Sequence, residues 1–387
     1  MKPISKKIRS IEESATLALN AKAKELIKQG RDILLFGVGE PDFETPEHIK
    51  EAAKRAIERG ETKYTPATGT NELKEAVVKK LKKENSLDYD KKNIVVSNGG
   101  KHALSNTVRA LCNRGDEIVV PSPYWMSYIE QIKIAGGVPI IVKCDEGNDF
   151  ELNIEDLKEK ISKKTKAVIL NYPNNPTGAV FSKVVLSRVA DLAVENDFYI
   201  ISDEVYEHFN YTGEHVSIAS LGEETKKRTI TINAVSKTYS MTGWRIGYIA
   251  ANDEIIRAIS NLQSQETSNP CSIAQAAALA ALTGGQDCVK KMVEAFRERR
   301  NLMVKRLKEV KGVRCVMPRG AFYAFPNISG LGMDSKKLSE QLLEKAQIAV
   351  VPGIEFGSDS HIRLSYATSI DKIKQGMDRL EDFCKRL

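Results

Sequence analysis

Lys237 and Arg245 combine a nucleophile with a group that binds phosphate. Lys237 follows the β-type run 229–235, and Arg245 lies after a small-residue turn in Gly-Trp-Arg-Ile-Gly-Tyr, which is expected to be a strand. A lysine leaving the C-terminal end of a strand reaches the crevice where open α/β sheets bind ligands, and its amine can form a Schiff base with a carbonyl. A guanidinium is a planar fork suited to phosphate. The pair favours an aldehyde cofactor that carries a phosphate, namely pyridoxal phosphate (PLP).

Two further strand ends carry polar side chains suited to the ring of such a cofactor. The expected strand 167–170 leads to Asn175, and the strand 198–202 leads to Asp203 and Tyr206. An aspartate buried beside a pyridinium keeps that nitrogen protonated, and a tyrosine in the same crevice could bond the phenolic oxygen. Taken singly, these residues are typical of turns and solvated surfaces, as lysines and arginines are. Three strand ends in succession favour the cofactor site.

A glycine turn between a strand and a helix could cradle the phosphate. The strand 93–96 is followed by Ser-Asn-Gly-Gly100-Lys101 and by a helix expected over 102–111. This arrangement aims free backbone N–H groups and the positive helix end at an anion. A Walker loop needs glycine at 95 and Ser or Thr at 102, but the chain has Val95 and His102, which excludes that class. A plain helix start is the alternative, and Lys237 and Arg245 favour the phosphate.

Two loops could contact a ligand through an aromatic ring and a bare backbone. Trp125 follows the expected strand 116–120 and could stack on a pyridine ring, although core packing is the usual role of tryptophan. The segment Gly-Val-Gly39-Glu-Pro-Asp begins like a dinucleotide fingerprint, but Pro41 interrupts it and Asp42 takes its sixth position. We reject a Rossmann interpretation and expect a glycine loop against a ligand.

The remaining patterns predict alternating helices and strands. Thr45 is expected to cap the helix 47–59, with Pro46 in its first turn, and Arg363 is expected off the apolar face of the strand 361–366. The other expected elements are helices 15–29 and 335–346, a helical region 270–310 interrupted near 284–285, strands 33–36, 313–317 and 321–326, and a turn at 350–353.

The composition limits the class of protein. The chain has 387 residues, 42% of them hydrophobic and 28% charged, with a net charge of +7. Acidic and basic residues are interleaved and no basic patch carries aromatics, so no nucleic-acid partner is expected. Six scattered cysteines and five histidines without ligand spacing indicate reduced thiols and no metal. No signal core or membrane-spanning run is present, which predicts a cytoplasmic protein without a membrane partner.

Four segments together resemble one family. They are Ser-Lys-x-x-x-Met-x-Gly-Trp-Arg-Ile-Gly-Tyr at 236–248, Gly-x-Gly-Glu-Pro-Asp at 37–42, Pro-Asn-Asn-Pro-Thr-Gly at 173–178 and Arg-Leu-Ser at 363–365. The chain resembles the class I, fold-type I PLP-dependent aminotransferases, most of all the bacterial and archaeal aspartate aminotransferases. The resemblance implies a three-layer α/β/α large domain over 46–289 with a mostly parallel sheet. It also implies a smaller α+β domain made of 1–45 and 290–387, and a homodimer with shared active sites.

The resemblance also assigns roles. PLP would sit as an aldimine on Lys237, with Asp203 on its ring nitrogen and Tyr206 and Asn175 on its phenolic oxygen. The phosphate would be held by Gly100, Lys101, Ser236, Arg245 and, from a neighbouring subunit, Tyr64. The amino acid would be anchored by Arg363, Asn175, Trp125 and the backbone of Gly39. The freed lysine would shuttle the α-proton, with amino-acid and 2-oxo-acid substrates exchanging in a ping-pong reaction.

The expected substrates are dicarboxylic. Ser14, Thr16 and Lys101 match the residues that contact the distal carboxylate of aspartate or glutamate in the resembling branch, with 2-oxoglutarate or oxaloacetate as acceptor. Two positions depart from it: Glu12 stands where relatives that accept prephenate have lysine, and Ala234 where many have a phosphate-binding hydroxyl.

Other functions on the same fold stay open. They are aminotransfer to aromatic or neutral amino acids or to prephenate, and a PLP-dependent β-lyase. A PLP-sensing regulator would need an added DNA-binding module, for which no spare segment is expected before residue 15 or after 366.

Overall fold

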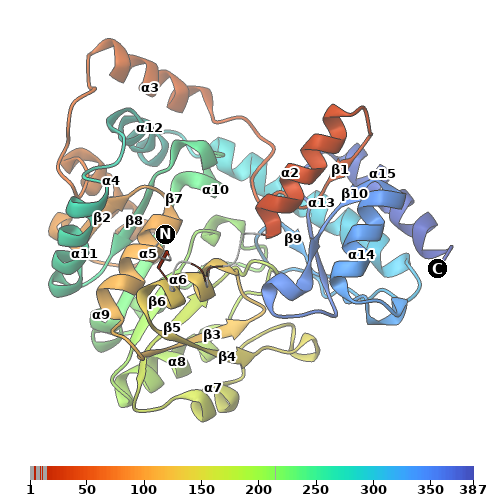
Figure 1. Ribbon diagram of the computed structural model, residues 1–387. Helices are drawn as coiled ribbons and strands as arrows, with labels where there is room; N and C mark the ends of the chain where they lie inside the picture. The colour runs from red at the N-terminus through yellow and green to blue at the C-terminus, as the bar shows by residue number, and fades with distance from the viewer. Residues whose placement is uncertain (1–3, 6–8, 10, 12–14, 214) are drawn as a thin grey trace.

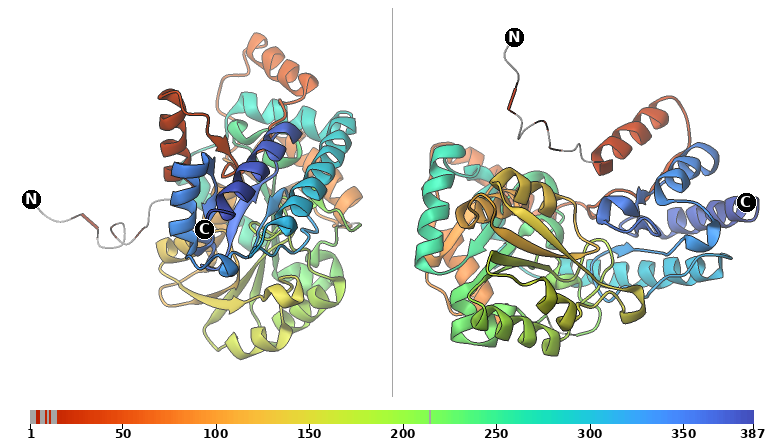
Figure 2. Two further views of the ribbon diagram at one scale, coloured as in Figure 1. Left: turned by 90° about the vertical axis from the view of Figure 1, so that its right-hand side faces the viewer. Right: turned by 60° about the horizontal axis from the view of Figure 1, so that its bottom comes forward.

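The computed structural model describes residues 4–5, 9, 11, 15–213 and 215–387. A seven-stranded sheet with helices forms a larger body, and two small sheets with helices form a smaller body beside it (Figure 1). The two further views show the same division, with the blue C-terminal helices and the red helix α2 (Ala15–Lys28) together in the smaller body (Figure 2). None of the helices described is both long and apolar enough to cross a membrane.

The main sheet is mostly parallel. Its strand order is β2-β8-β7-β6-β5-β3-β4, and only β8 runs antiparallel to its neighbours. The strands are β2 (Ile94–Ser97), β3 (Glu117–Ser122), β4 (Val138–Lys143), β5 (Thr165–Asn171), β6 (Tyr199–Asp203), β7 (Thr229–Ala234) and β8 (Gly247–Ala250). The central strands are buried on both faces, which is why they appear in the sequence as nearly continuous apolar runs.

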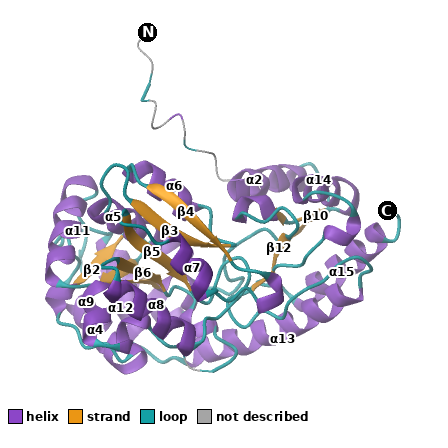
Figure 3. Cartoon of the chain, turned by 90° about the horizontal axis from the view of Figure 1, so that it is seen from below, coloured by secondary structure: helices purple, strands orange, loops and turns teal. Residues whose placement is uncertain are grey.

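Helices cover both faces of this sheet (Figure 3). Alternate strand residues such as Val95, Ile169 and Ile201 pack with α5 (Gly100–Leu111), α6 (Ser127–Ala135) and α11 (Asp253–Glu266). The residues between them, such as Val168 and Ile200, pack on the opposite layer. That layer contains α3 (Glu47–Glu58), α4 (Asn71–Asn85), α7 (Ile154–Lys160), α8 (Lys183–Glu195), α9 (Glu223–Arg228) and α12 (Ser272–Thr283). The predicted three-layer α/β/α fold is confirmed.

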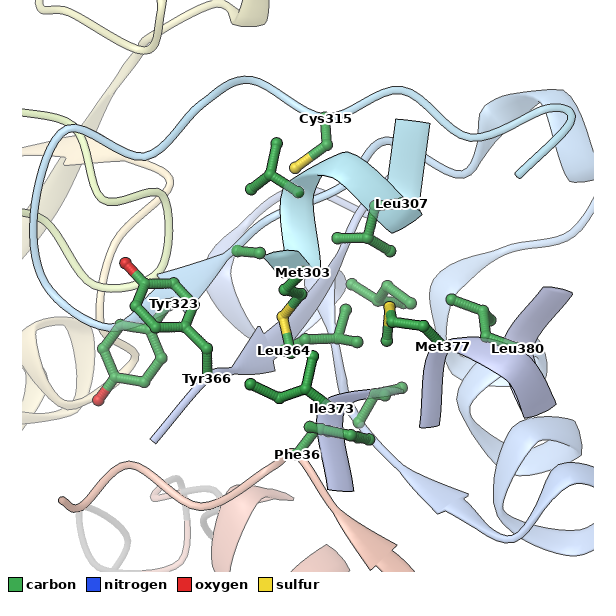
Figure 4. Packing of buried hydrophobic residues seen from close by; sticks show 14 of the residues in the cluster. Phe36, Met303, Leu307, Cys315, Tyr323, Leu364, Tyr366, Ile373, Met377 and Leu380 are labelled. Carbon is green, nitrogen blue, oxygen red and sulfur yellow. The ribbon is translucent and has the colours of Figure 1, made fainter. Parts of the chain in front are cut away.

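The smaller body joins segments from both ends of the chain. Strand β1 (Leu34–Leu35) pairs in parallel with β10 (Ile348–Ala349), and β11 (Val351–Pro352), β12 (Ile362–Ser365) and β9 (Tyr323–Ala324) form a second sheet. The helices are α2, α13 (Asp287–Glu309), α14 (Ser335–Gln341), a π-helical turn at Leu342–Ala346 and α15 (Ile370–Cys384). Phe36 lies in its core with Leu364, Ile373 and Met377 (Figure 4).

Several local predictions were wrong because tertiary contacts decided them. Pro46, not Thr45, takes the cap position of α3, since the Thr45 hydroxyl donates to Ser240 O (2.7 Å) and accepts from Trp244 Nε1 (3.1 Å). The expected strand 313–317 is reduced to one bridge, Arg314 to Asn327. The expected turn at 350–353 contains β11, and the helix expected from 102 begins at Gly100.

Phe36 is expected to be essential for the smaller body. It is fully buried in the core between β1 and α15. Phe36→Ala should lower the free energy of unfolding by about 3–5 kcal/mol, because the lost burial and the cavity both cost stability. Urea unfolding would measure this. Val184→Ala, at a residue 73% exposed, is the control and should stay within about 0.5 kcal/mol of the parent chain; equal effects of the two substitutions would contradict the prediction.

Candidate active site

The carboxyl ends of β5, β6 and β7 meet at one edge of the main sheet. Asn171 pairs in register with Asp203, and Asp203 with Ile232. Parallel strands bring the side chains that follow them to the same crevice. Strand β7 continues into the short helix α10 (Val235–Thr238), which carries Lys237.

Lys237 projects from α10 toward the N-terminal glycine loop. Its Nζ donates to Gly39 O (2.6 Å). The pKa of Lys237 is lowered to about 8. Burial is the main cause, the charges of Arg245 and Arg363 act in the same direction, and those of Glu40 and Asp203 oppose the shift. A lysine with this lowered pKa has a larger neutral fraction near pH 7, and the neutral amine is the nucleophile.

Asp203 ends β6 and is almost fully buried. Tyr128 on α6 donates its hydroxyl to Oδ2 (2.6 Å), and the backbone N–H of Val205 donates to Oδ1 (3.3 Å). Burial raises the pKa of Asp203 to about 6 in spite of these two bonds, which lower it. A cation beside this carboxylate would favour the ionised form, as a protonated ring nitrogen does.

Arg363 on β12 reaches from the smaller body to the sheet edge. Its Nη1 donates to Asn175 Oδ1 (2.9 Å) and its Nη2 to Gly37 O (2.8 Å). The residue is 3% exposed, and its Nε has no hydrogen-bond partner. Among the described residues no carboxylate pairs with this guanidinium. A buried, unpaired cation is costly, so a site for an anion such as a carboxylate is the functional explanation. Arg363 lies off the apolar face of its strand, as the sequence predicts, and it is buried there.

Tyr206 and Tyr323 link the groups around Lys237 and Arg363. Their hydroxyls lie 2.8 Å apart, and the Tyr323 ring lies 4.5 Å from the Arg363 guanidinium carbon. A Cβ at Gly39 would lie 2.9 Å from the Tyr323 hydroxyl, so a larger residue there would displace that hydroxyl. Tyr323 and Tyr128 were not predicted as site residues, because nothing in their local sequence distinguishes them from aromatic residues of the core.

The glycine turn before α5 lies against Arg245. Gly99 has φ +87°, and a side chain at this position would overlap the Arg245 guanidinium. Arg245, itself at φ 56° before β8 and not inside a strand as expected, donates from Nη1 to Thr242 O (2.7 Å). A Cβ at Gly100 would lie 3.7 Å from the side chain of Ala234. The free N–H groups at the start of α5 therefore lie beside Arg245 and the segment 234–237, which includes the buried Ser236.

Trp125 and Lys101 lie together near Asp203. Lys101 Nζ lies 5.0 Å from the centre of the Trp125 ring, and that ring packs edge-on against Tyr128, the partner of Asp203. Trp125 is thus linked to Asp203 through Tyr128, and Lys101 lies over the ring of Trp125.

Three predicted residues are not brought to this site by the described chain. Tyr64 is 89% exposed, away from the site of its own chain. Thr16 lies in α2, where the position of its side chain is not described. Ser14, like Glu12, lies outside the described residues. The roles of all the site residues stay predictions.

Residues 31–380 match the family model described as aminotransferase class I and II. The chain belongs to this family. It is therefore an enzyme of the aminotransferases, a family that depends on PLP. It is 44% identical to the aspartate aminotransferase of Bacillus subtilis over 389 residues, which cover 99% of each chain. It is 45% identical to the aspartate/prephenate aminotransferase of Thermus thermophilus, with 98% of each covered.

Solved structures agree with this assignment. The aspartate aminotransferase of Thermus thermophilus with maleate has a TM-score of 0.96 at 44% identity, covering 99% of this chain and 100% of that one. The aromatic aminotransferase of Pyrococcus horikoshii has a TM-score of 0.90 at 43% identity, covering 94% and 99%. Both names occur among the relatives of this aminotransferase, so the fold alone does not choose the substrate.

The hydroxyls of Tyr206 and Tyr323 are expected to depend on each other. Tyr323→Phe should lower the free energy of unfolding by about 1–3 kcal/mol, because it leaves a buried hydroxyl without its partner. Tyr206→Phe should act alike. The double variant should cost less than the sum of the two, since removing both hydroxyls leaves none unpaired. Urea unfolding of the four proteins would measure this, and strict additivity would show that the pair is not coupled.

Proposed function

We propose that this aminotransferase moves the amino group of aspartate or glutamate to 2-oxoglutarate or oxaloacetate, with PLP as cofactor, in a ping-pong reaction. The observation that carries the proposal is Arg363, a buried guanidinium with an unpartnered Nε in the crevice of Lys237. An α-carboxylate is an anion of the size and geometry that a guanidinium binds by two parallel hydrogen bonds. The names of the relatives support the choice of aspartate.

The residues present fit PLP. Asp203, whose pKa is raised and whose carboxylate accepts two hydrogen bonds, would hold the ring nitrogen. Tyr206 and Asn175 would bind the phenolic oxygen. Trp125 would cover the ring. The phosphate would lie at the glycine turn before α5. The groups that would bind it are those of Gly100, Lys101, Ser236, Arg245 and, from a second copy of this chain, Tyr64. When bound, PLP supplies an electron sink for the negative charge that develops at the substrate's α-carbon.

The side chains of the chain would do the rest of the chemistry. Arg363, Asn175 and the backbone of Gly39 would orient the amino acid, so that its α-hydrogen faces Lys237. The neutral Nζ would take the proton from the α-carbon and return one later in the reaction. A pKa of about 8 suits this task, because the group has to accept and donate near neutral pH.

The distal carboxylate would be bound by Lys101 with Ser14 and Thr16. Lys101 lies over the ring of Trp125. Prephenate is a second candidate, because relatives at 45–47% identity carry that name. The carboxylate of Glu12 would oppose a second acidic group there.

We also propose the assembly and location that the sequence predicts. The large domain would span 46–289, and residues 1–45 and 290–387 would form the small domain. A homodimer would place the exposed Tyr64 in the partner's site. A cytoplasmic location would suit the six free cysteines.

The absorption spectrum of the purified protein tests the cofactor and the substrate together. A visible band that bleaches with aspartate and returns with 2-oxoglutarate is the expected result, and prephenate is then tried as acceptor. A response to leucine or phenylalanine alone would overturn the dicarboxylate assignment.

The variant Lys237→Ala should lack the visible band and lose nearly all turnover. When PLP is added to the unsubstituted protein, the rate of band formation should rise with pH and reach half its maximum near pH 8, since only the neutral amine of Lys237 attacks. A midpoint near the ordinary lysine value would contradict the lowered pKa.

Lys101→Met should select against dicarboxylates. The value of kcat/KM for aspartate should fall at least about tenfold, because a hydrogen bond to a charged group contributes about 1.5–3 kcal/mol. The value for alanine should fall less, because alanine has no distal carboxylate and is affected only through the contact of Lys101 with the phosphate. Lys92→Met, at an exposed lysine paired with Asp253, is the control. Equal losses for both amino acids would assign Lys101 to the cofactor phosphate instead.

A further inference from the structure

A buried carboxylate with a full set of protein donors lies directly after Tyr206. Glu207 accepts from Lys80 and Asn233 at Oε1 and from Asn85 at Oε2. The side chains of Glu207 and Lys80 are 5% and 4% exposed. Lys80 and Asn85 belong to α4, whereas Asn233 belongs to β7. None of these residues has a role in the reaction proposed above.

This cluster lies on the side of the sheet away from α6. Asp203 bonds Tyr128 on α6, while the next residue, Glu204, accepts from Ser217 (2.8 Å) and Asn85 (3.2 Å). Neighbouring residues at a strand end point to opposite faces. The loop that carries Asp203 and Tyr206 is therefore fixed by the hydrogen bonds of Glu204 and Glu207 on the opposite face of the sheet.

A metal site is the obvious alternative, and the contacts argue against it. Two triads have ligand atoms within 4.8 Å of one another: Glu84, Glu207 and His208, and Glu204, Glu207 and His215. Both share Glu207, whose two oxygens are already bonded to protein donors. The ammonium of Lys80 is the cation of this cluster, so no further cation is needed.

Side chains, not the sheet, connect the two catalytic loops. The last backbone hydrogen bond between them in the described chain runs from Glu204 N to Ile232 O (2.9 Å). Beyond it, Asn233 Nδ2 donates to Glu207 (2.7 Å), and the Thr238 hydroxyl lies 3.2 Å from His208 Nδ1. Thr238 directly follows Lys237, as Glu207 directly follows Tyr206.

We propose that Glu207, anchored by Lys80 and Asn85, is a positioning residue for the transamination: it fixes the loop of Asp203 and Tyr206 against the segment of Lys237. The inference rests on the function proposed above. Asn233 transmits the constraint, because its Oδ1 also accepts from Ala234 N (2.7 Å) at the start of α10.

The anchor stays ionised over the working pH range. Burial alone would raise the pKa of Glu207, but the charges of Lys80, His208 and His215 lower it to about 2. A charge-assisted network of this kind is stronger and more directional than neutral hydrogen bonds. Small displacements of reacting groups, of the order of 1 Å, can reduce rates about 100-fold.

The test compares four variants with the parent, loaded with cofactor for the kinetic and spectral measurements and free of it for hydrogen exchange. Lys80→Met/Glu207→Leu removes the anchor without changing net charge, and apolar replacement of a buried pair is often tolerated. Glu207→Gln keeps an acceptor for Asn233. Thr238→Val removes only the contact between the Thr238 hydroxyl and His208. Arg306→Met is the stability control, because Arg306 pairs with Asp378 and Glu381 between α13 and α15, away from the site.

Three experiments are done. Steady-state kinetics give kcat and KM for aspartate, the rate of visible-band formation gives its pH midpoint, and hydrogen exchange is followed for the peptide 233–240 without cofactor. The double variant should lose at least about tenfold in kcat with KM within about threefold. It should also shift the midpoint by at least about half a pH unit and exchange faster. Glu207→Gln should fall between it and the parent. Arg306→Met should lower the melting temperature and leave the results of all three experiments unchanged.

A folded double variant with the parent's kcat, midpoint and exchange would overturn the proposal. If that variant does not fold, Thr238→Val decides: it should show the same changes on a smaller scale, and their absence overturns the proposal. Failure of the proposed function is seen separately in the parent protein, which would show no visible band or no response to aspartate. The exchange measurement needs neither, so it still tests the link between the two loops.

Discussion

The guanidinium of Arg363 joins three parts of the chain that are far apart in sequence. It lies on β12 of the smaller body and donates to Asn175 at the edge of the main sheet and to Gly37 in the N-terminal segment. Tyr323 packs against it and also bonds Tyr206. Because these contacts cross from one body to the other, the site exists only when the two bodies are docked. The small sheets position Arg363, Phe36 packs in the core of the smaller body, and the glycine loop accepts the hydrogen bond of Lys237.

Two buried groups at one sheet edge have pKa values that are shifted in opposite directions. Burial raises the pKa of Asp203 to about 6 and lowers that of Lys237 to about 8. Both shifts act against the charged form, as expected where water is displaced. Buried ionisable groups without full pairing cost stability, and such groups cluster at functional sites. On the other face, Glu204 and Glu207 are paired with many donors, which is the pattern expected of groups that hold a structure.

Much of the fold and of the site was predictable, because parallel strands end where apolar runs give way to polar residues. Asn175, Asp203, Tyr206 and Lys237 were predicted in this way, and the resemblance supplied the role of Arg363; these roles stay predictions. Thr45 was assigned wrongly as a cap, since its hydroxyl contacts Ser240 and Trp244, far away in sequence. Tyr323 was missed, because nothing local separates an aromatic residue of the core from one that turns its hydroxyl into a crevice.

The sequence by itself determined the family, the layered architecture and the residue types at the strand ends. Those features depend on local periodicity and on motifs that occupy short segments. The tertiary structure alone decided which groups share a hydrogen bond and in which direction each pKa moves. Lys237 donates a hydrogen bond to Gly39, and Lys80 donates one to Glu207; the partners in each pair are more than a hundred residues apart in sequence. Distances and burial of this kind arise only when the whole chain is packed, so no local pattern encodes them.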